Sequence, residues 1–302
     1  MSSKKISTRF LITSDTLNFG ANKSYTKEDI RHLVPKVDVL LHSGNLTMLG
    51  GLTAYKKGLE ILSHIDAELK LIIAGDHDVS LDGVYWKTQG GVAEAWVDWD
   101  PEEHSQAMDI MTGSLAKQAG VTYLEEGIHR FTLKSGAAFT IYASPYHASF
   151  RSRAFAYNCV QDPFNDSAQT APGSTSIART PIPDFSGVDI VMTHGPPRGI
   201  LDESYDGDMG CENLLRAVRR ARPLLHCFGH LREGYGMKKI KWTREEAAEI
   251  EHLDDEMTFP HAQRCSVIRG EETLMVNGSL RDQRNQPNNL PWIVDLDLPV
   301  GS

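Results

Sequence analysis

The chain of 302 residues carries 31 Lys and Arg against 40 Asp and Glu, which gives a formal net charge of −9. This acidic balance argues against a nucleic-acid partner, which needs a concentrated basic face. No stretch approaches the roughly 20 apolar residues of a membrane span, and the first residues lack the apolar region of a signal peptide. We therefore expect a cytoplasmic protein, with one domain over 1–302 and a small molecule as its partner; the sequence leaves the oligomeric state open.

Buried strands alternate with helices in the first third of the chain. Apolar runs predict strands at 9–14, 37–44 and 69–78, with one helix after Thr26 and another over about 51–64. Each strand ends in a polar cluster, and these clusters read "SDT", "SGN" and "GDHD". Because ligands bind beyond the carboxyl ends of the strands in open α/β sheets, we expect the three clusters to converge in space.

The middle of the chain combines helices, a hairpin and a long polar stretch. Residues 79–120 are predicted to be mostly helical, and strands follow at 121–126, 129–136 and 138–146. The Ser135-Gly136 turn favours a hairpin between the last two. The polar stretch at about 146–186 is too long for a simple connector, so we predict a lid-like insertion there.

The last third returns to alternating strands and helices. A strand beginning at 188 leads to a polar loop with His194, a helix is expected over 211–223, and the strand 224–230 runs into the loop "CFGHLREGYG". The acidic segment 243–256 is typical of a solvated helix face. The final strands are predicted at 266–270, 273–279 and 292–298.

Five loop clusters form an ordered set of motifs. They are Asp15-Thr16-Leu17, Gly44-Asn45, Gly75-Asp76-His77-Asp78, Thr193-His194-Gly195 and Gly229-His230-Leu231-Arg232. This set resembles the motifs of the calcineurin-like metallophosphoesterase superfamily, D-x-H, G-D, G-N-H-D, a lone H and G-H-x-H, and "THGPPRGILD" with "CFGHLREGYG" is its most specific part. The resemblance implies an α/β fold, a four-layer α/β/β/α sandwich of two mixed β-sheets, and it points to a divergent, fungal member.

The residues at the first metal position depart from that family. The resemblance places Asp15, Leu17, Asn45 and Arg232 there, where leucine cannot ligate, asparagine offers only a neutral carbonyl, and arginine has a permanent charge and no lone pair. A divalent ion about 4 Å from a guanidinium would be repelled by roughly 8 kcal/mol at an effective dielectric of about 20. We expect no metal at this position, and we hypothesise that Arg232 takes the place of the cation and pairs with Asp15.

The second metal position keeps most of its ligand chemistry. By the resemblance, Asp76, His194, His230 and Asn45 could hold a single Zn²⁺, Mn²⁺ or Fe²⁺ ion. The alternative is a metal-free pocket in which Asp76 becomes another partner for Arg232. We expect no cofactor, with one divalent transition metal as the alternative.

Other residues are candidates for catalysis or substrate binding. The resemblance makes His77 the acid that protonates the leaving group and Asp78 the carboxylate that orients it. Leu17 would add an apolar surface to the pocket, and Tyr235 could close one wall or pack in the interior. Arg151 and Arg153, on the predicted lid, could bind a carboxylate or phosphate of the substrate or simply be solvated.

Three functions are compatible with this pattern. We favour a re-purposed enzyme of small-molecule, secondary metabolism, in which Arg232, Asn45 and the histidines donate hydrogen bonds to a carbonyl or carboxylate and promote isomerisation, cyclisation or cycloaddition. The second is a phosphoesterase with one metal and His77 as acid. The third is a non-catalytic protein that binds a small molecule on the inherited fold.

Overall fold

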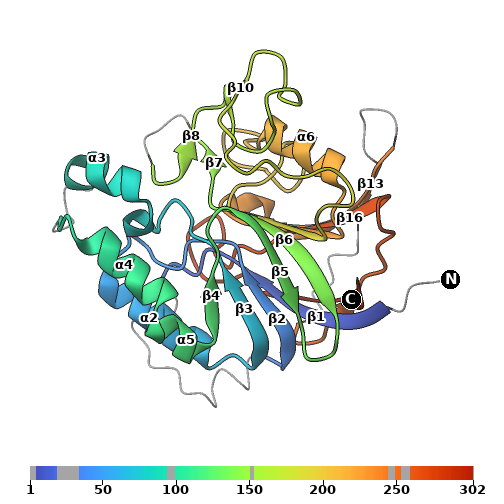
Figure 1. Ribbon diagram of the computed structural model, residues 1–302, viewed down its shortest axis with the longest axis horizontal. Coiled ribbons are helices and arrows are strands. Elements are labelled where there is room, and N and C mark those ends of the chain that lie inside the picture. Colours follow the sequence, from blue (N-terminus) through green and yellow to red (C-terminus); the bar gives the residue numbers. More distant parts are fainter. Residues whose placement is uncertain are drawn as a thin grey trace.

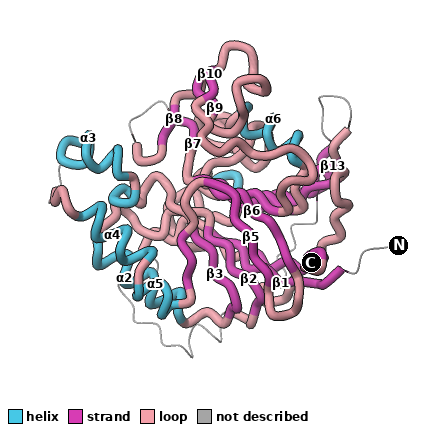
Figure 2. Tube along the Cα trace, viewed as in Figure 1, coloured by secondary structure: helices cyan, strands magenta, loops and turns pink. Residues whose placement is uncertain are grey.

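The computed structural model describes residues 5–18, 34–93, 99–149, 153–243, 249–252 and 259–301. Two β-sheets lie face to face, with helices on the outer side of each (Figures 1 and 2). The expected helix after Thr26 falls outside the described residues.

The first sheet has six strands in the order β15-β17-β1-β2-β3-β4. The strands β1, β2, β3 and β4 run parallel, and β17 is antiparallel to β1. Their apolar side chains are buried in continuous runs, as is typical of strands covered on both faces. The bounds are β1 Lys5–Thr13, β2 Val37–His42, β3 Ala67–Ile72, β4 Val121–Tyr123, β15 Gln263–Arg264 and β17 Trp292–Pro299.

The second sheet has seven strands in the order β14-β13-β16-β12-β11-β6-β5. The four strands β16, β12, β11 and β6 are parallel, whereas β5, β13 and β14 are antiparallel to their neighbours. Both sheets are therefore mixed. The bounds are β5 Gly127–Thr132, β6 Ala138–Ser144, β11 Ile190–Thr193, β12 Leu225–Phe228, β13 Gly236–Lys241, β14 Glu249–His252 and β16 Glu272–Asn277.

Helices cover the outer faces of the two sheets (Figure 1). The first sheet is covered by α2 Leu52–Ser63, α4 Glu103–Thr112 and α5 Ser114–Ala119, with α3 Gly83–Ala93 and the short helix η1 Val79–Leu81 beyond its carboxyl edge. The second is covered by α6 Glu212–Ala221, and the short helix η2 Arg232–Gly234 follows β12. Buried residues recur on α6 at helical spacing, at Leu214, Ala217, Val218 and Ala221, so one face of that helix packs on the sheet.

Three clusters of buried side chains fill the spaces between these layers. The central cluster lies between the two sheets and includes Phe10 and Ile12 of β1 and Ile141 of β6. A second cluster joins the first sheet to α2, α4 and α5, and a third joins the second sheet to α6. Each fully buried Leu, Ile or Phe contributes roughly 1.5–3 kcal/mol relative to an exposed one. The predicted α/β/β/α sandwich is confirmed.

The polar stretch at 146–186 lies beside α6 and beyond the upper edge of the second sheet (Figure 1). It contains four two-residue strands, β7 His147–Ala148, β8 Ala156–Tyr157, β9 Gln161–Asp162 and β10 Thr175–Ser176. The strands pair in parallel as β7 with β8 and β9 with β10. Its function as a lid stays a prediction.

Two assignments near the C-terminus were wrong. Residues 266–270 form no strand; the short strand lies earlier, at β15. Within the acidic segment 243–256, residues 249–252 form the strand β14 rather than a helix, because they pair with β13, which the sequence reading did not predict. In both cases pairing with a neighbouring strand overrides the local pattern.

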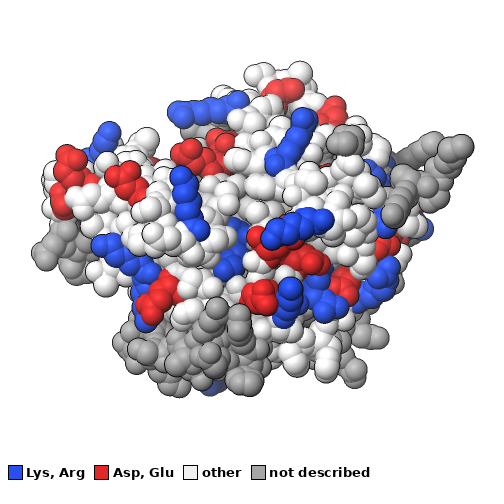
Figure 3. Space-filling model, turned by 60° about the horizontal axis from the view of Figure 1, so that its bottom comes forward, with Lys and Arg blue, Asp and Glu red and all other residues white. Residues whose placement is uncertain are grey.

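The charged groups are mixed on the face shown in Figure 3, where acidic and basic side chains alternate over the part that the structure describes. None of the described helices combines the length and the apolar character needed to cross a membrane.

Candidate active site

The ends of five parallel strands bring the predicted residues together. Asp15 follows β1, Asn45 follows β2 and Asp76 follows β3, while His194 and His230 follow β11 and β12 of the facing sheet. Hydrogen bonds link these residues across 30 to 215 positions of sequence. The convergence expected from the strand-end clusters is present.

The side-chain amide of Asn45 bridges two buried carboxylates. Its Nδ2 lies 2.8 Å from Oδ1 of Asp15 and 3.0 Å from Oδ1 of Asp76, so each amide hydrogen has an acceptor. Its Oδ1 accepts a hydrogen bond of 2.9 Å from the backbone N–H of His77. The carbonyl that could have ligated a metal is therefore already in use within the protein.

Asp76, His194 and His230 form a group that could hold a metal ion. One possible ligand atom from each lies within 4.8 Å of the other two. Oδ1 of Asp76 is 3.0 Å from Nε2 of His194 and 3.2 Å from Nδ1 of His230. Nδ1 of His194 lies 2.8 Å from the carbonyl oxygen of Ser43. A ligating histidine commonly donates its second ring N–H to such an acceptor, so this arrangement suits a metal ligand.

Burial and mutual attraction shift the pKa values of this group. Burial raises the pKa of Asp76, but the charge and hydrogen bonds of His230 and His194 outweigh it and leave that pKa well below its usual range. Burial lowers the pKa of His194, but the hydrogen bond to Asp76 and the charge of Asp15 outweigh it, so the pKa is raised. Both shifts favour the charged forms, an Asp76 carboxylate and a protonated His194.

His77 is positioned differently from the sequence prediction. Nδ1 of His77 lies 2.7 Å from the carbonyl oxygen of Met48, and its Nε2 lies 4.0 Å from Oδ2 of Asp76. Asp78 does not orient the ring. Its carboxylate joins the loops after β2 and β3 by accepting four hydrogen bonds, from the backbone N–H of Gly75, Leu46 and Thr47 and from Oγ1 of Thr47.

The predicted ion pair between Arg232 and Asp15 is not formed. Among the described residues, the carboxylate of Asp15 accepts hydrogen bonds from Oγ of Ser14 at 2.6 Å, from Asn45 and from the backbone N–H of His230 at 3.0 Å. These three donors satisfy it without a guanidinium. Arg232 is half-buried and lines a cavity of about 390 Å³.

The other predicted substrate-binding residues are dispersed. Leu17 is 1% exposed and belongs to the interior rather than to an open surface. Tyr235 lines the same cavity as Arg232 and stacks on Trp292 with 5.4 Å between ring centroids. Arg153 is half-buried between β7 and β8, and Arg151 lies outside the described residues.

His147 is a neighbour of the site that the sequence reading missed. Its ring centroid is 4.5 Å from that of His230 and 6.1 Å from that of His194. Nε2 lies 3.2 Å from the carbonyl oxygen of Ala154, and Nδ1 is buried with no hydrogen-bond partner among the described residues. Burial, helped by the charge of His230, lowers the pKa of His147 to about 3, so the ring is neutral. It belongs to none of the strand-end motifs, and only its place in "SPYHASF" could have drawn attention to it.

The backbone at the site is unusually constrained. Asp15, Asn45 and His230 have positive φ values of 53°, 60° and 67°. Residues other than glycine rarely adopt such angles, and those that do cluster at functional sites. A Cβ added to Gly75 would lie 2.6 Å from Cε1 of His194. The loops are therefore packed against one another without room for a larger residue.

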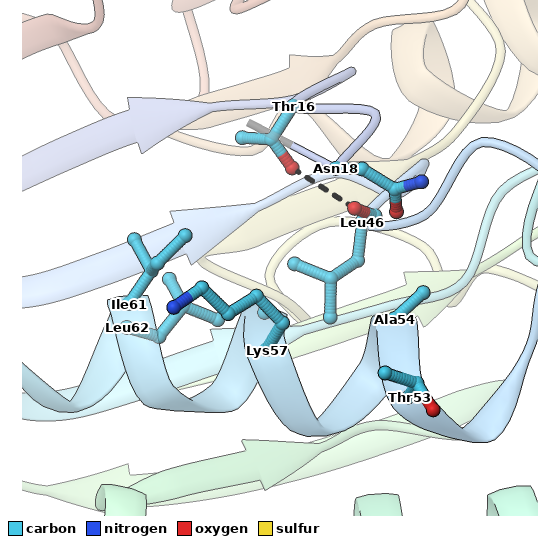
Figure 4. Close-up of a pocket in the computed structure, with 9 residues that line it drawn as sticks. Thr16, Asn18, Leu46, Thr53, Ala54, Lys57, Ile61 and Leu62 are labelled. Atoms are coloured by element: carbon cyan, nitrogen blue, oxygen red, sulfur yellow. Dashed lines mark hydrogen bonds between the residues drawn. The ribbon is translucent and has the colours of Figure 1, made fainter. Parts of the chain in front are cut away.

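A separate cavity of about 380 Å³ lies between α2 and the loops after β1 and β2 (Figure 4). Lys57, Ile61 and Leu62 of α2 face Thr16 and Leu46 across it (Figure 4). None of the predicted catalytic or metal-binding residues is among its described lining residues, so we assign it no part in the site.

Comparison with known proteins identifies several relatives of similar sequence. No family model matches the chain. Metallophosphoesterase domain-containing protein 1 of Homo sapiens is 28% identical over 303 residues, which span 98% of this chain and 73% of that protein, and the Mus musculus protein matches equally. The chain is a relative of the metallophosphoesterase domain-containing proteins. A UPF0046 protein of Caenorhabditis elegans is also 28% identical, over 71% of this chain and 63% of its own length.

This relationship confirms the resemblance that the motifs indicated. The Asp76 group lies at the strand ends, where ligands bind in open α/β sheets. The fungal source stays a prediction.

Proposed function

We propose that the protein is a phosphoesterase that uses one divalent metal ion to hydrolyse a small phosphate ester. The observation that supports this most strongly is the group of Asp76, His194 and His230, with ligand atoms within 4.8 Å of one another. Two imidazoles and a carboxylate suit Zn²⁺, Mn²⁺ or Fe²⁺. An ion bound there would supply positive charge that stabilises developing charge on a phosphoryl oxygen.

The remaining residues have roles that follow from their contacts. His77 lies at the edge of the group with its Nδ1 fixed by Met48, so a proton on Nε2 could be donated to the leaving oxygen. Asn45 holds Asp76 in place through one amide hydrogen and Asp15 through the other. Arg232 would attract an anionic part of the substrate.

A metal-free enzyme of secondary metabolism is the second candidate. It is favoured by one observation: Asn45 and His194 already satisfy Asp15 and Asp76 with hydrogen bonds, so the group is complete without a cation. In this case Arg232 and the histidines would polarise a carbonyl or carboxylate during isomerisation, cyclisation or cycloaddition. The inherited fold would also allow a protein that binds such a molecule without catalysis.

Metal analysis and hydrolysis assays distinguish these candidates. We expect one divalent ion per chain after dialysis against Mn²⁺ or Zn²⁺, and hydrolysis of an aryl phosphate that stops on chelation. Asp76→Asn should lose both, and His129→Ala, at a half-buried position of the edge strand β5, should keep both. Absence of bound metal from a folded protein would refute the proposal, and activity that survives chelation would favour the metal-free enzyme.

A further inference from the structure

The cavity of about 390 Å³ beside Arg232 has the chemistry of an anion-binding site. Its described lining residues come from η2 and from the turn before β17 and are polar or charged: Arg232, Glu233, Tyr235, Asp282, Gln283, Arg284, Gln286, Asn288 and Asn289. We propose that this cavity binds a second anionic group of the substrate, a carboxylate or a phosphate. The proposal rests on the proposed function, which it extends by defining the substrate class.

Two guanidinium groups from distant parts of the chain meet at this cavity. Arg232 lies directly after β12 and Arg284 lies some fifty residues later. Neither forms an ion pair with another described residue. Guanidinium groups bind carboxylate and phosphate oxygens through paired, charge-assisted hydrogen bonds. Two such groups that form no ion pair with any described residue can therefore both serve a ligand.

A third arginine lies behind the cavity. The Arg281 guanidinium donates hydrogen bonds to the carbonyl oxygens of Leu17 at 3.0 Å and Asn285 at 2.8 Å, while its buried Nε has no hydrogen-bond partner in the part of the chain that the structure describes. Burial lowers the pKa of Arg281, and the charge of Arg232 lowers it further. Bound anions relieve this repulsion between like charges.

The two carboxylates that line the cavity match Arg232 and Arg284 in formal charge, so what decides anion binding is whether those carboxylates are free to compete. Asp282 is occupied by its own turn, because it accepts hydrogen bonds from the backbone N–H groups of Arg284 and Gln286 and from Nδ2 of Asn288. Glu233 also lines the cavity and opposes an anion. Asp282 is thus held by its own turn, and Glu233 is the described lining carboxylate with which a bound anion has to compete for the arginines.

The cavity is joined to the Asp76 group by a single loop. Leu231 alone separates His230, which contacts Asp76, from Arg232. The Leu17 carbonyl that accepts from Arg281 belongs to the loop that carries Asp15. Asp76, His194 and His230 do not line this cavity, so a substrate that binds at both places has to extend along this loop; its class would be phosphate esters that carry another phosphate or a carboxylate.

Anion binding by the metal-free protein tests this subsite without depending on catalysis. The full chain is stripped with a chelator and titrated calorimetrically, first with inorganic phosphate and then with malonate. We expect saturable binding that Arg232→Gln and Arg284→Gln each weaken about tenfold, the effect of one charge-assisted hydrogen bond. Glu233→Gln should strengthen it several-fold. Arg130→Gln, an exposed arginine on β5, serves as the matched control and should bind like the wild type.

The outcomes separate this proposal from the proposed function. Tighter binding of phosphate than of malonate identifies a second phosphate as the ligand group, and the reverse order identifies a carboxylate. Absence of saturable binding, or equal affinities of Arg232→Gln and Arg130→Gln, would overturn the subsite. A protein that binds the anion but takes up no metal would refute the phosphoesterase and leave the subsite standing.

Discussion

Nε2 of His194 lies 3.0 Å from Oδ1 of Asp76, and Nδ1 of the same ring lies 2.8 Å from the carbonyl oxygen of Ser43. Both ring nitrogens therefore face oxygen acceptors. An imidazole has one N–H when neutral and two when charged, so the metal-free ring must carry two protons to satisfy both. A metal ion that takes Nε2 must displace one of them.

This geometry predicts that metal binding strengthens as the pH rises. Because the pKa of His194 is raised, the metal-free protein holds the extra proton below that pKa, and each ion bound there releases it. The affinity should rise about tenfold per pH unit until the pH passes the folded-state pKa. Calorimetry in two buffers of different ionisation enthalpy measures the protons released, and an affinity independent of pH without proton release would contradict the prediction.

The same shift predicts the stability of the chelated protein. A raised histidine pKa stabilises the folded state fully below the unfolded-state value of about 6.5, and this contribution is lost as the pH rises through the folded-state pKa. The urea midpoint of the chelated protein should therefore fall with rising pH in that range, and saturating Mn²⁺ should remove the fall. A fall of the same size with and without Mn²⁺ would show that it does not come from His194.

Asn45→Asp should destabilise the metal-free protein and increase its affinity for a metal ion. The change removes the amide hydrogens that bridge Asp15 and Asp76 and puts a third carboxylate between them. We expect a loss of about 3 kcal/mol in the free energy of unfolding without metal, from two lost hydrogen bonds to charged groups, and recovery with Mn²⁺, measured by urea titration.

A matched control for that variant is Asn165→Asp. Asn165 is also buried, and its Nδ2 donates to both carboxylate oxygens of Asp162, far along the chain from the strand-end motifs. It should be destabilised similarly, but Mn²⁺ should not restore it. Equal recovery of both variants would mean that the ion does not act through Asn45.

The sequence was sufficient for the layers and for the strand-end residues, and it was insufficient for the contacts between them. The β1, β2 and β3 strands end in polar residues that must lie at one sheet edge, so the position of Asp76 near Asp15 and Asn45 followed from topology. Its position near His194 of the facing sheet followed from the resemblance. The hydrogen-bond partners of Asp15 could not be predicted in this way. They include the backbone N–H of His230 and the hydroxyl of Ser14, which no motif records.

Backbone donors and long-range pairing account for the other differences. Asp78 binds loop N–H groups instead of the His77 ring, because the loops after β2 and β3 approach closely enough to use all its acceptors. The strand β14 forms from acidic sequence because β13 lies beside it. Such interactions depend on which segments lie side by side in the folded protein, and a sequence pattern within one segment cannot predict them.

Gly75→Ala should disrupt the site although the change is small. The added Cβ would lie 2.6 Å from Cε1 of His194 and 2.7 Å from the backbone nitrogen of Asn45, so the loops would have to separate. Overpacking of this kind costs about 1–3 kcal/mol. The urea midpoint and the Mn²⁺ affinity should both fall, whereas Gly301→Ala, whose nearest new contact would be 3.3 Å, should change neither. Unchanged Mn²⁺ affinity in Gly75→Ala would show that the loops can adjust freely.

His147 should control how well His230 binds a metal. His194 and His77 are each oriented by a carbonyl oxygen at their second nitrogen, but no described residue forms a hydrogen bond with Nε2 of His230. The orientation of that ring depends instead on packing against His147, which is fixed by Ala154.

Removing this support should weaken metal binding without removing a ligand. We expect His147→Ala to lower Co²⁺ affinity about tenfold, the usual effect of losing a group that orients a ligand, and to alter the visible absorption spectrum of bound Co²⁺. His147→Phe keeps a ring against His230 and should retain most of the affinity, and His129→Ala, at a half-buried position of β5, controls for histidine loss in general. If His147→Ala bound Co²⁺ with the affinity and spectrum of the wild type, packing by His147 would have no part in orienting His230, and its buried Nδ1 would need another explanation.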